Sequence, residues 1–358
     1  MSRFMASRYR SLEAYTPGEQ PTDMKYIKLN TNESPFPPSP GVIRAISSER
    51  VEELRLYSDP TATLLRERLA TLFGVGKNNV FVSNGSDDIL NFSFMAFGEG
   101  GVAFPEISYG FYPVYANLHG LDARQIPLTE DFRIDPEDYH NVGRAVVIAN
   151  PNAPTGIALS KGEIEGIVKN NPDHVVVIDE AYVDFGAESV VDLTEKYENL
   201  LVVRTFSKSY SLAGARLGFA IGNEALIADL EKIKYSTNPY NVNRLTLLAG
   251  VAAVEENDYY MQNCRKIEQN RAFTVEELKA LGFSVLPSSA NFIFAKTDRI
   301  GGETLYRALK ARGILIRHFS RDEIKDYNRI TIGAREEMQA LVNAVREILA
   351  ETARKEQL

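Results

Sequence analysis

The sequence predicts an α/β protein with a large, mostly parallel sheet sandwiched by helices and a smaller α+β domain. Three short apolar runs, 145–149, 175–178 and 200–203, each read as a strand buried on both faces, because a strand with one face in water would alternate polar and apolar residues. Segments such as 63–73 repeat apolar residues at helical spacing instead. The length of 358 residues is too great for one small core and fits two domains.

Composition and charge narrow the class of protein. The chain is 44% hydrophobic and 25% charged, which is ordinary for a soluble globular protein. Its net charge of −8 argues against general binding to nucleic acid or to anionic membranes, since such binding calls for a basic surface. The first residues contain no long apolar stretch, so neither a signal peptide nor a membrane span is expected. We therefore expect a cytoplasmic protein without nucleic-acid or membrane partners.

Cysteine and histidine usage leads to the same expectation. A single cysteine, Cys264, excludes an intrachain disulfide framework and fits a reducing cytoplasm. The histidines lie far apart in the sequence and show no zinc-ligand spacing: His119, His140, His174 and His318. No metal site is expected.

In chain order, the first segment is an arm rather than a domain. Residues 1–40 are polar and rich in proline and glycine, and the prolines near the end of this segment keep it extended. A disordered leader is the alternative, although the apolar residues within 26–29 provide anchors. We expect a large domain over 41–250 and a small domain over 251–358.

The small domain is expected to be α+β. A long helical pattern over 224–280 leads into it. Within it, the sequence predicts strands at 283–286, 291–295, 314–317 and 328–333, and helices at 302–312 and from 335 onward.

The residues after the strand run at 200–203 carry the chemistry. A lysine, two hydroxyls and a guanidinium follow it, namely Lys208, Thr205, Ser207 and Arg216. The carboxyl end of a strand is where open α/β sheets bind ligands, and hydroxyls with an arginine suit a phosphate. A partly desolvated lysine beside another cation becomes a nucleophilic amine. This suggests a Schiff base to pyridoxal phosphate, although a basic surface turn explains the segment alone equally well.

A second segment favours the cofactor. The strand run 175–178 delivers Asp179 and Tyr182 at its carboxyl end. Pyridoxal phosphate needs an acid against its ring nitrogen, because the protonated ring is the electron sink, and a donor near its phenolic oxygen. A lone aspartate after a strand is usually a helix cap. Paired with Lys208 from the next strand, Asp179 is better explained as the partner of the ring nitrogen.

Three motifs together resemble a known family. The loop Asn150-Pro151-Asn152-Ala153-Pro154-Thr155-Gly156, the segment 179–182 and the segment 205–216 resemble the fold-type I aminotransferases. Within these the chain is most similar to the histidinol-phosphate aminotransferase family, along nearly its whole length. The resemblance implies pyridoxal phosphate as cofactor, with Lys208 as its Schiff-base lysine, Asp179 on the ring nitrogen and Tyr182 on the phenolic oxygen.

The same resemblance implies further cofactor contacts. Gly85, Ser86 and Asp87 open a predicted helix whose free backbone N–H groups and positive dipole end suit a phosphate. An ordinary capped helix is compatible with this assignment. Tyr109 resembles the aromatic residue that stacks on the cofactor ring, where a flat side chain matches a flat ring.

Two positions depart from the family's pattern. The family generally has an asparagine before Pro-Thr-Gly that hydrogen-bonds the phenolic oxygen, whereas this chain has Ala153. We expect either Asn152 to replace it or Tyr182 to make that bond alone. The family's Tyr-Pro-Asp turn contains Ser58 in place of its proline here, and the turn is expected to be less rigid. Its tyrosine, Tyr57, is implied to reach the cofactor phosphate of a neighbouring subunit.

Four residues are candidate substrate contacts. Resemblance places Tyr15 and Asn32 of the arm over the site. Arg317 and Arg329 lie at strand ends among apolar neighbours, where an arginine either reaches solvent or awaits an anion. Both resemble arginines that bind the substrate's anionic group in the family.

We predict that the protein is a dimeric aminotransferase with shared active sites. The resemblance implies the reaction of L-histidinol phosphate with 2-oxoglutarate, giving imidazole acetol phosphate and L-glutamate. A threonine-phosphate decarboxylase or an aromatic aminotransferase could share every motif. A cofactor-binding regulatory module is the alternative from another class, and the complete set of Lys208, Asp179 and Tyr182 argues against it.

Overall fold

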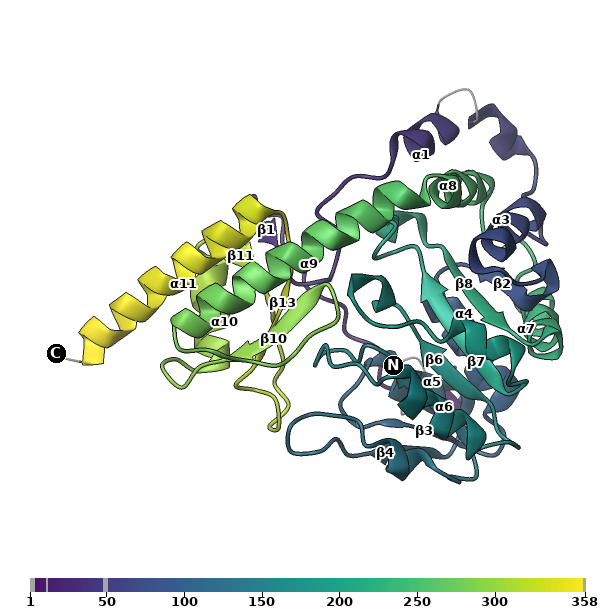
Figure 1. Ribbon diagram of the computed structural model, residues 1–358, viewed down its shortest axis with the longest axis horizontal. Coiled ribbons are helices and arrows are strands. Elements are labelled where there is room, and N and C mark those ends of the chain that lie inside the picture. Colours follow the sequence, from purple (N-terminus) through teal and green to yellow (C-terminus); the bar gives the residue numbers. More distant parts are fainter. Residues whose placement is uncertain (1–3, 11, 48–50, 357–358) are drawn as a thin grey trace.

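The apolar runs predicted as strands form the middle of a seven-stranded sheet in the computed structural model, which describes residues 4–10, 12–47 and 51–356 (Figure 1). In spatial order the strands are β2 (Val80–Ser83), β8 (Gly218–Gly222), β7 (Leu200–Thr205), β6 (Val176–Asp179), β5 (Ala145–Ala149), β3 (Val102–Pro105) and β4 (Ala123–Ile126). All run parallel except β8, which is antiparallel to both of its neighbours. This mostly parallel sheet confirms the predicted fold class.

Successive residues of the central strands enter two separate apolar cores, one on each face of the sheet. Val202 lies in the core that includes α3 (Thr63–Phe73) and α6 (Lys161–Lys169), whereas Val203 lies in the core of α4 (Ser86–Phe97) and α5 (Phe111–His119). The first core also includes α1 (Pro40–Ala45) and α8 (Arg244–Glu255), and the second includes α7 (Glu224–Thr237). Burial on both faces explains why these strands read as continuous apolar runs.

The small domain is built on an antiparallel sheet, as the predicted α+β character requires. Its strands, in spatial order, are β12 (Arg317–His318), β13 (Asn328–Thr331), β10 (Phe292–Lys296) and β9 (Ser284–Val285). The long helix α9 (Asn257–Ala280) runs from the large domain onto it, and α10 (Gly302–Ala311) and α11 (Arg335–Glu356) complete a core of its own (Figure 1).

The arm belongs to the small domain before it crosses to the large one. Its strand β1 (Ile27–Lys28) pairs in parallel with β11 (Ile314–Leu315). At the boundary between the large and small domains, α8 packs on α1 and α3 and continues through residue 250, the predicted end of the large domain. A domain boundary at residue 250 would therefore divide α8 (Arg244–Glu255).

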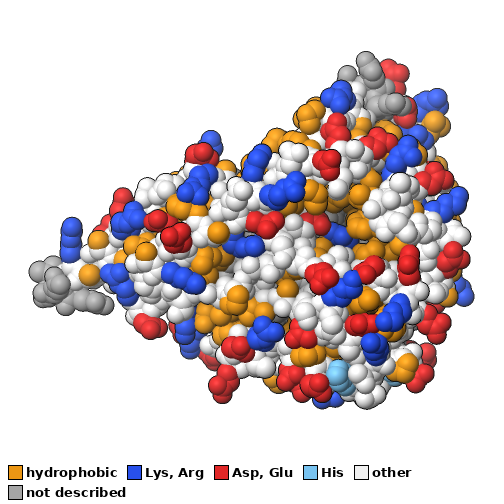
Figure 2. All heavy atoms as spheres, viewed as in Figure 1, with side chains coloured by type: hydrophobic (Ala, Val, Ile, Leu, Met, Phe, Trp, Pro, Cys, Tyr) orange, Lys and Arg blue, Asp and Glu red, His pale blue; other side chains and the backbone are white. Residues whose placement is uncertain are grey.

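Short 3₁₀ turns and a mixed surface complete the description. The turns are Ser7–Tyr9, Glu52–Arg55, Lys77–Asn79, Pro136–Tyr139, Val183–Phe185, Val191–Glu195 and Ala213–Ala215. On the face shown in Figure 2, acidic and basic side chains are interspersed. Among the described residues, no helix is both long and apolar enough to span a membrane.

Candidate active site

The predicted site residues converge because they follow parallel strands. Asp179 ends β6 and Thr205 ends β7, and these two strands are neighbours in the sheet. The loops after β2, β3 and β5 leave the same edge, since those strands run in the same direction. Ligands bind at this edge of open α/β sheets.

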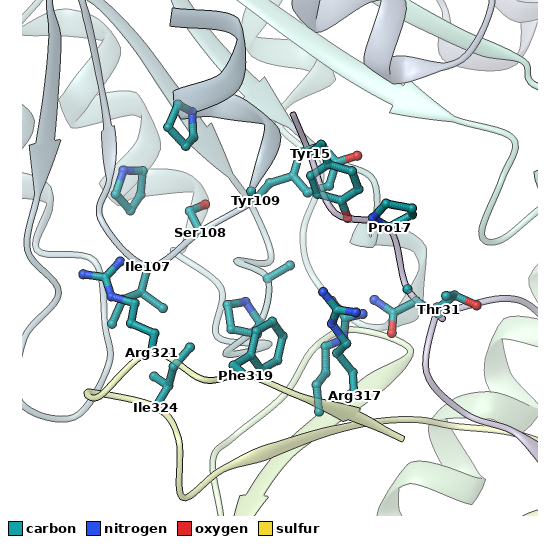
Figure 3. Close-up of a pocket in the computed structure, with 18 of the residues that line it drawn as sticks. Tyr15, Pro17, Thr31, Ile107, Ser108, Tyr109, Arg317, Phe319, Arg321 and Ile324 are labelled. Carbon is teal, nitrogen blue, oxygen red and sulfur yellow. The ribbon is translucent and has the colours of Figure 1, made fainter. Parts of the chain in front are cut away.

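Two adjoining cavities lie at this edge, and Lys208, Tyr109 and Tyr182 line both. We call them the inner cavity, of about 360 Å³, and the outer cavity, of about 510 Å³. The inner cavity is lined by most of the predicted cofactor residues: Ser86, Asp87, Tyr109, Asp179, Tyr182, Thr205, Ser207, Lys208 and Arg216. The outer cavity is lined by the predicted substrate residues: Tyr15, Asn32, Arg317 and Arg329 (Figure 3).

Asp179 is a buried carboxyl group without a cationic partner among the described residues. Its side chain accepts hydrogen bonds from the Tyr112 hydroxyl at 3.0 Å and from the Ala181 N–H at 3.2 Å. Burial raises the pKa of the Asp179 carboxyl to about 7, because these two hydrogen bonds only partly offset the loss of water. A protonated ring nitrogen is the kind of partner that would stabilise this group in its ionised form.

Lys208 lies between the two cavities, beside Tyr182. Its Nζ donates a 3.2 Å hydrogen bond to the Thr31 carbonyl and lies 5.8 Å from the centre of the Tyr182 ring. The Tyr182 hydroxyl accepts a 3.0 Å hydrogen bond from the Asn32 side-chain amide. With its acceptor position occupied in this way, the Tyr182 hydroxyl keeps its own hydrogen to donate into the cavity.

The opposite end of the inner cavity is suited to a phosphate. Helix α4 begins at Ser86 after Gly85, and no side chain caps its first N–H groups. A side chain at Gly85 would place its Cβ 2.8 Å from the Arg216 guanidinium, and one at Gly218 would place its Cβ 2.4 Å from the Ser86 nitrogen. Two glycines therefore keep open a space that a helix terminus and an arginine adjoin.

Asp87 orients its neighbours in this end of the cavity. Its carboxylate accepts hydrogen bonds from the Tyr109 hydroxyl at 2.7 Å and from Arg216 at 2.9 Å. Arg216 also lies 3.5 Å from the Ser207 hydroxyl. Since a carboxylate repels a phosphate, we propose that Asp87 contributes by holding Arg216 and Tyr109 in place.

These residues fit pyridoxal phosphate. The inner cavity offers an amine, a phenol, an aromatic wall at Tyr109, the phosphate-binding end just described and the Asp179 carboxyl group, which has no cationic partner among the described residues. Lys208 and Tyr182 face the outer cavity as well, so a bound cofactor would be open to a substrate there.

The outer cavity holds two arginines without carboxylate partners among the described residues. Arg329 donates a 3.0 Å hydrogen bond to the Asn30 carbonyl, and its Nε is buried without a partner. Desolvation lowers the pKa of the Arg329 guanidinium below its usual value, and the charge of Arg317 acts in the same direction. Figure 3 shows Arg317 pointing into the space beneath Tyr15. Two neighbouring guanidinium groups without a carboxylate partner among the described residues form a site for an anion.

Three predicted cofactor residues, Gly85, Asn152 and Tyr57, line neither cavity. The Asn152 amide donates hydrogen bonds to the Ile107 carbonyl at 3.0 Å and to the Thr155 hydroxyl at 3.3 Å, so its donors are used within the loops. In this structure Tyr182 is the donor available for the phenolic oxygen, since Ala153 lines the cavity at the other position. Tyr57 is 79% exposed and stacks on Tyr240 with ring centres 4.6 Å apart.

The turn at Tyr57 is held by the residue that replaces the family's proline. The Ser58 hydroxyl donates a 2.6 Å hydrogen bond to the Val242 carbonyl, and Arg244 donates a 2.9 Å hydrogen bond to the Tyr57 carbonyl. The Ser58 hydroxyl therefore ties this turn to the segment that precedes α8.

Sequence reasoning missed several residues of the site. Tyr112, which holds Asp179, comes from the first turn of α5, and its place three residues after Tyr109 was the only signal for it. Arg321 and Glu106 both line the outer cavity and pair with each other across the two domains. Nothing in the sequence connects Arg321 with Glu106.

Comparison with known proteins agrees with this geometry. Residues 24–345 match the aminotransferase class I and II family. The chain is 51% identical over 352 residues to a histidinol-phosphate aminotransferase from Brachyspira hyodysenteriae, covering 98% of this chain and 99% of the relative. It is 50% identical over 351 residues to one from Marinomonas sp., covering 97% and 99%.

A solved structure has the same fold. The histidinol-phosphate aminotransferase from Sinorhizobium meliloti, determined in complex with pyridoxal-5′-phosphate, superposes with a TM-score of 0.83 at 25% identity and covers 91% of this chain and 92% of its own. The chain therefore belongs to the class I and II aminotransferases, and within them to the histidinol-phosphate aminotransferase family.

Proposed function

We propose that the protein transfers the amino group of L-histidinol phosphate to 2-oxoglutarate, giving imidazole acetol phosphate and L-glutamate, as part of histidine biosynthesis. The observation that carries this proposal is the pair Arg317 and Arg329, which line the same cavity as Lys208 and have no ion-pair partner among the described residues. Histidinol phosphate has no carboxylate, so its phosphate is its strongest handle, and two guanidinium groups can bind it by charge-assisted hydrogen bonds.

The residues of the inner cavity have distinct roles. Pyridoxal phosphate, when bound, supplies an electron sink that stabilises negative charge on the substrate carbon. Asp179 holds a proton at the ring nitrogen, and Tyr182 donates to the phenolic oxygen. Ser86, Thr205, Ser207 and Arg216 bind the phosphate.

Lys208 provides both the covalent attachment and the proton transfer. Its amine would hold the cofactor covalently and, once released, would act as a base. Because Nζ lies where the two cavities adjoin, it can take the proton from the carbon that bears the substrate amine. The Thr31 carbonyl, which accepts from Nζ, keeps the amine on this side of the cavity.

We propose that the enzyme is a homodimer with shared active sites. Tyr57 is exposed and lines neither cavity, so it does not contribute to the active site of its own chain. Large apolar side chains are also exposed elsewhere in the segments 43–64 and 235–240, namely Ile43, Ile46, Val51, Leu54, Leu56, Leu64, Tyr235 and Tyr240, of which Tyr240 stacks on Tyr57. Contiguous exposed apolar surface is typical of protein interfaces. A partner chain on this surface would bring Tyr57 to the neighbouring cofactor phosphate.

The expected compartment is the cytoplasm. The single cysteine, Cys264, is buried and unpaired, which fits a reducing environment.

A panel of amino donors tests the assignment of substrate. Histidinol phosphate, threonine phosphate and phenylalanine are offered to the loaded enzyme with 2-oxoglutarate, and glutamate and carbon dioxide are measured. We expect glutamate from histidinol phosphate at the highest kcat/KM. Carbon dioxide from threonine phosphate with no turnover of histidinol phosphate would instead assign the decarboxylase reaction. Preference for phenylalanine would assign an aromatic aminotransferase.

A further inference from the structure

A group of four polar side chains lies behind the active site and takes no part in the chemistry described so far. We call Glu180, Asp184, Arg204 and Ser209 the buried cluster. Glu180 is 2% exposed, Arg204 is 5% exposed and Ser209 is 4% exposed. Two carboxylates and one guanidinium are thus held largely away from water, which requires a reason.

The cluster is closed by hydrogen bonds and ion pairs. Arg204 donates a short hydrogen bond to one oxygen of Asp184, and the Ser209 hydroxyl donates to the other at 2.6 Å. The Arg204 guanidinium also lies 3.9 Å from Glu180. Glu180 accepts further hydrogen bonds at 2.7 Å from the Val190 N–H and the Ser189 hydroxyl.

Three members of the cluster are chain neighbours of active-site residues. Glu180 follows Asp179, Arg204 precedes Thr205, and Ser209 follows Lys208. In the extended backbone of β7, Arg204 and Thr205 point in opposite directions, whereas Lys208 and Ser209 lie in the turn that follows this strand. The cluster therefore ties together, from behind, the end of β7, the residue that follows β6 and the turn that carries the reactive lysine.

Stability alone is a weak explanation for these charges. Removing two carboxylates and a guanidinium from water costs about as much as their mutual attraction returns, so such groups are often replaceable by apolar ones. Burial raises the pKa of Glu180, with Arg204 opposing the shift. The hydrogen bonds of the cluster offer a different benefit, because they fix the backbone positions next to the catalytic groups. Misplacement of a reacting group by about 1 Å can lower the rate on the order of 10²-fold.

We propose that the buried cluster positions Lys208 against Asp179, and that the hydrogen bond from Ser209 to Asp184 is the contact that sets the direction of the lysine side chain. Ser209 and Asp184 are positioning residues, since neither lines a cavity. The proposal rests on Lys208 as the reactive amine.

The direct test replaces Ser209 by alanine and measures the orientation of the bound cofactor. Visible circular dichroism of the loaded enzyme reports how rigidly its chromophore is held. We expect Ser209→Ala to reduce the dichroism per bound cofactor to less than about half and to lower kcat roughly tenfold, with KM for the amino donor within about twofold. Asp184→Asn, which keeps the shape of the side chain, should act in the same direction.

Two matched variants separate positioning from loss of structure. Ser209→Thr keeps the hydroxyl and should restore most of the dichroism and of kcat. Tyr210→Phe removes a 2.6 Å hydrogen bond to Asn257 from the adjacent residue, and Tyr210 does not contact the cluster by a hydrogen bond. It should leave the dichroism unchanged.

The outcomes are distinguishable. Unchanged dichroism and kcat in Ser209→Ala would overturn the proposal, as would an equal loss in Tyr210→Phe or no recovery in Ser209→Thr. Reductive labelling of the wild-type enzyme is done first, because a label on a lysine other than Lys208 would reject the proposed active site itself.

Discussion

The side-chain amide of Asn32 donates a 3.0 Å hydrogen bond to the hydroxyl of Tyr182, and both residues are buried. Asn32 is in turn held by the small domain. Its Oδ1 accepts from the Thr331 hydroxyl at 3.0 Å, and its carbonyl accepts from Asn291 at 3.0 Å. The small domain thereby fixes a residue of the large domain's catalytic set. Asn32, expected from the sequence to contact substrate, also orients Tyr182.

Loss of the Asn32 amide is expected to free the Tyr182 hydroxyl. Asn32→Ala should lower kcat roughly tenfold, because a hydrogen bond to a group that stabilises developing charge is worth about 1–2 kcal/mol. Steady-state kinetics with histidinol phosphate measures the effect.

A double-mutant cycle shows whether Asn32 acts through Tyr182. In a Tyr182→Phe background, Asn32→Ala should cost much less than it does alone. Equal costs in both backgrounds would mean that Asn32 acts on the substrate independently of Tyr182.

Asp179 is expected to destabilise the cofactor-free protein and to stabilise the loaded one. Its pKa is raised from 3.8 to about 7, so the ionised form is disfavoured in the folded state, and stability is lost as the pH rises through this window. In the cofactor-free protein, Asp179→Asn removes this penalty. The difference in free energy of unfolding between Asp179→Asn and the unsubstituted protein should therefore shift in favour of the variant by about 2–3 kcal/mol between about pH 5 and about pH 8.

Urea unfolding of the two cofactor-free proteins measures the difference. The same substitution should weaken cofactor binding, since the ring nitrogen loses its partner. A uniform effect of Asp179→Asn at all pH values would contradict the raised pKa.

Arg317 and Arg329 are expected to act on the phosphate of the substrate. Replacing either by alanine should cost roughly 2–5 kcal/mol in kcat/KM for histidinol phosphate, as for breaking a desolvated charge pair. Histidinol, which lacks the phosphate, should be a similarly poor substrate for the intact enzyme. The variants should discriminate much less between the two substrates.

Arg321 is the matched control in the same cavity. It also lines the outer cavity, but it is already paired with Glu106 and Glu323. Arg321→Ala should therefore keep most of the preference for the phosphorylated substrate. If Arg321→Ala loses that preference and Arg317→Ala retains it, the phosphate site is misassigned.

Tyr57 is expected to act across a dimer interface. Mixing Lys208→Ala with Tyr57→Phe chains should give hybrid dimers in which one site contains both native residues. At limiting cofactor, the mixture should be more active than either parent. A fully active monomer, shown by sedimentation during turnover, would refute the shared site.

The sequence was sufficient to predict that Asp179 and Lys208 lie in one cavity. The apolar runs before them identify parallel strands, and parallel strands bring their carboxyl ends to one edge, whereas the roles of these two residues stay predictions. The two-sided burial of Val202 and Val203 explains why those runs were readable.

Contacts between distant segments were not predictable. Tyr112 meets Asp179, and Arg321 meets Glu106, only because separately predicted elements pack at particular positions. The Asn152 amide donates to the Ile107 carbonyl rather than into the cavity, and no local sequence pattern reveals this contact. Local sequence determines which elements form, whereas partner choice follows from tertiary packing.

The most direct test of the account is the location of the covalent cofactor attachment. The purified enzyme, loaded with pyridoxal phosphate, is reduced with borohydride, digested and mapped by mass spectrometry. A single modified peptide is expected, with the label on Lys208. A label on another lysine, such as Lys161 at the start of α6, which pairs with Asp192, or the buried Lys234, which pairs with Glu231, would contradict the assignment of the whole site.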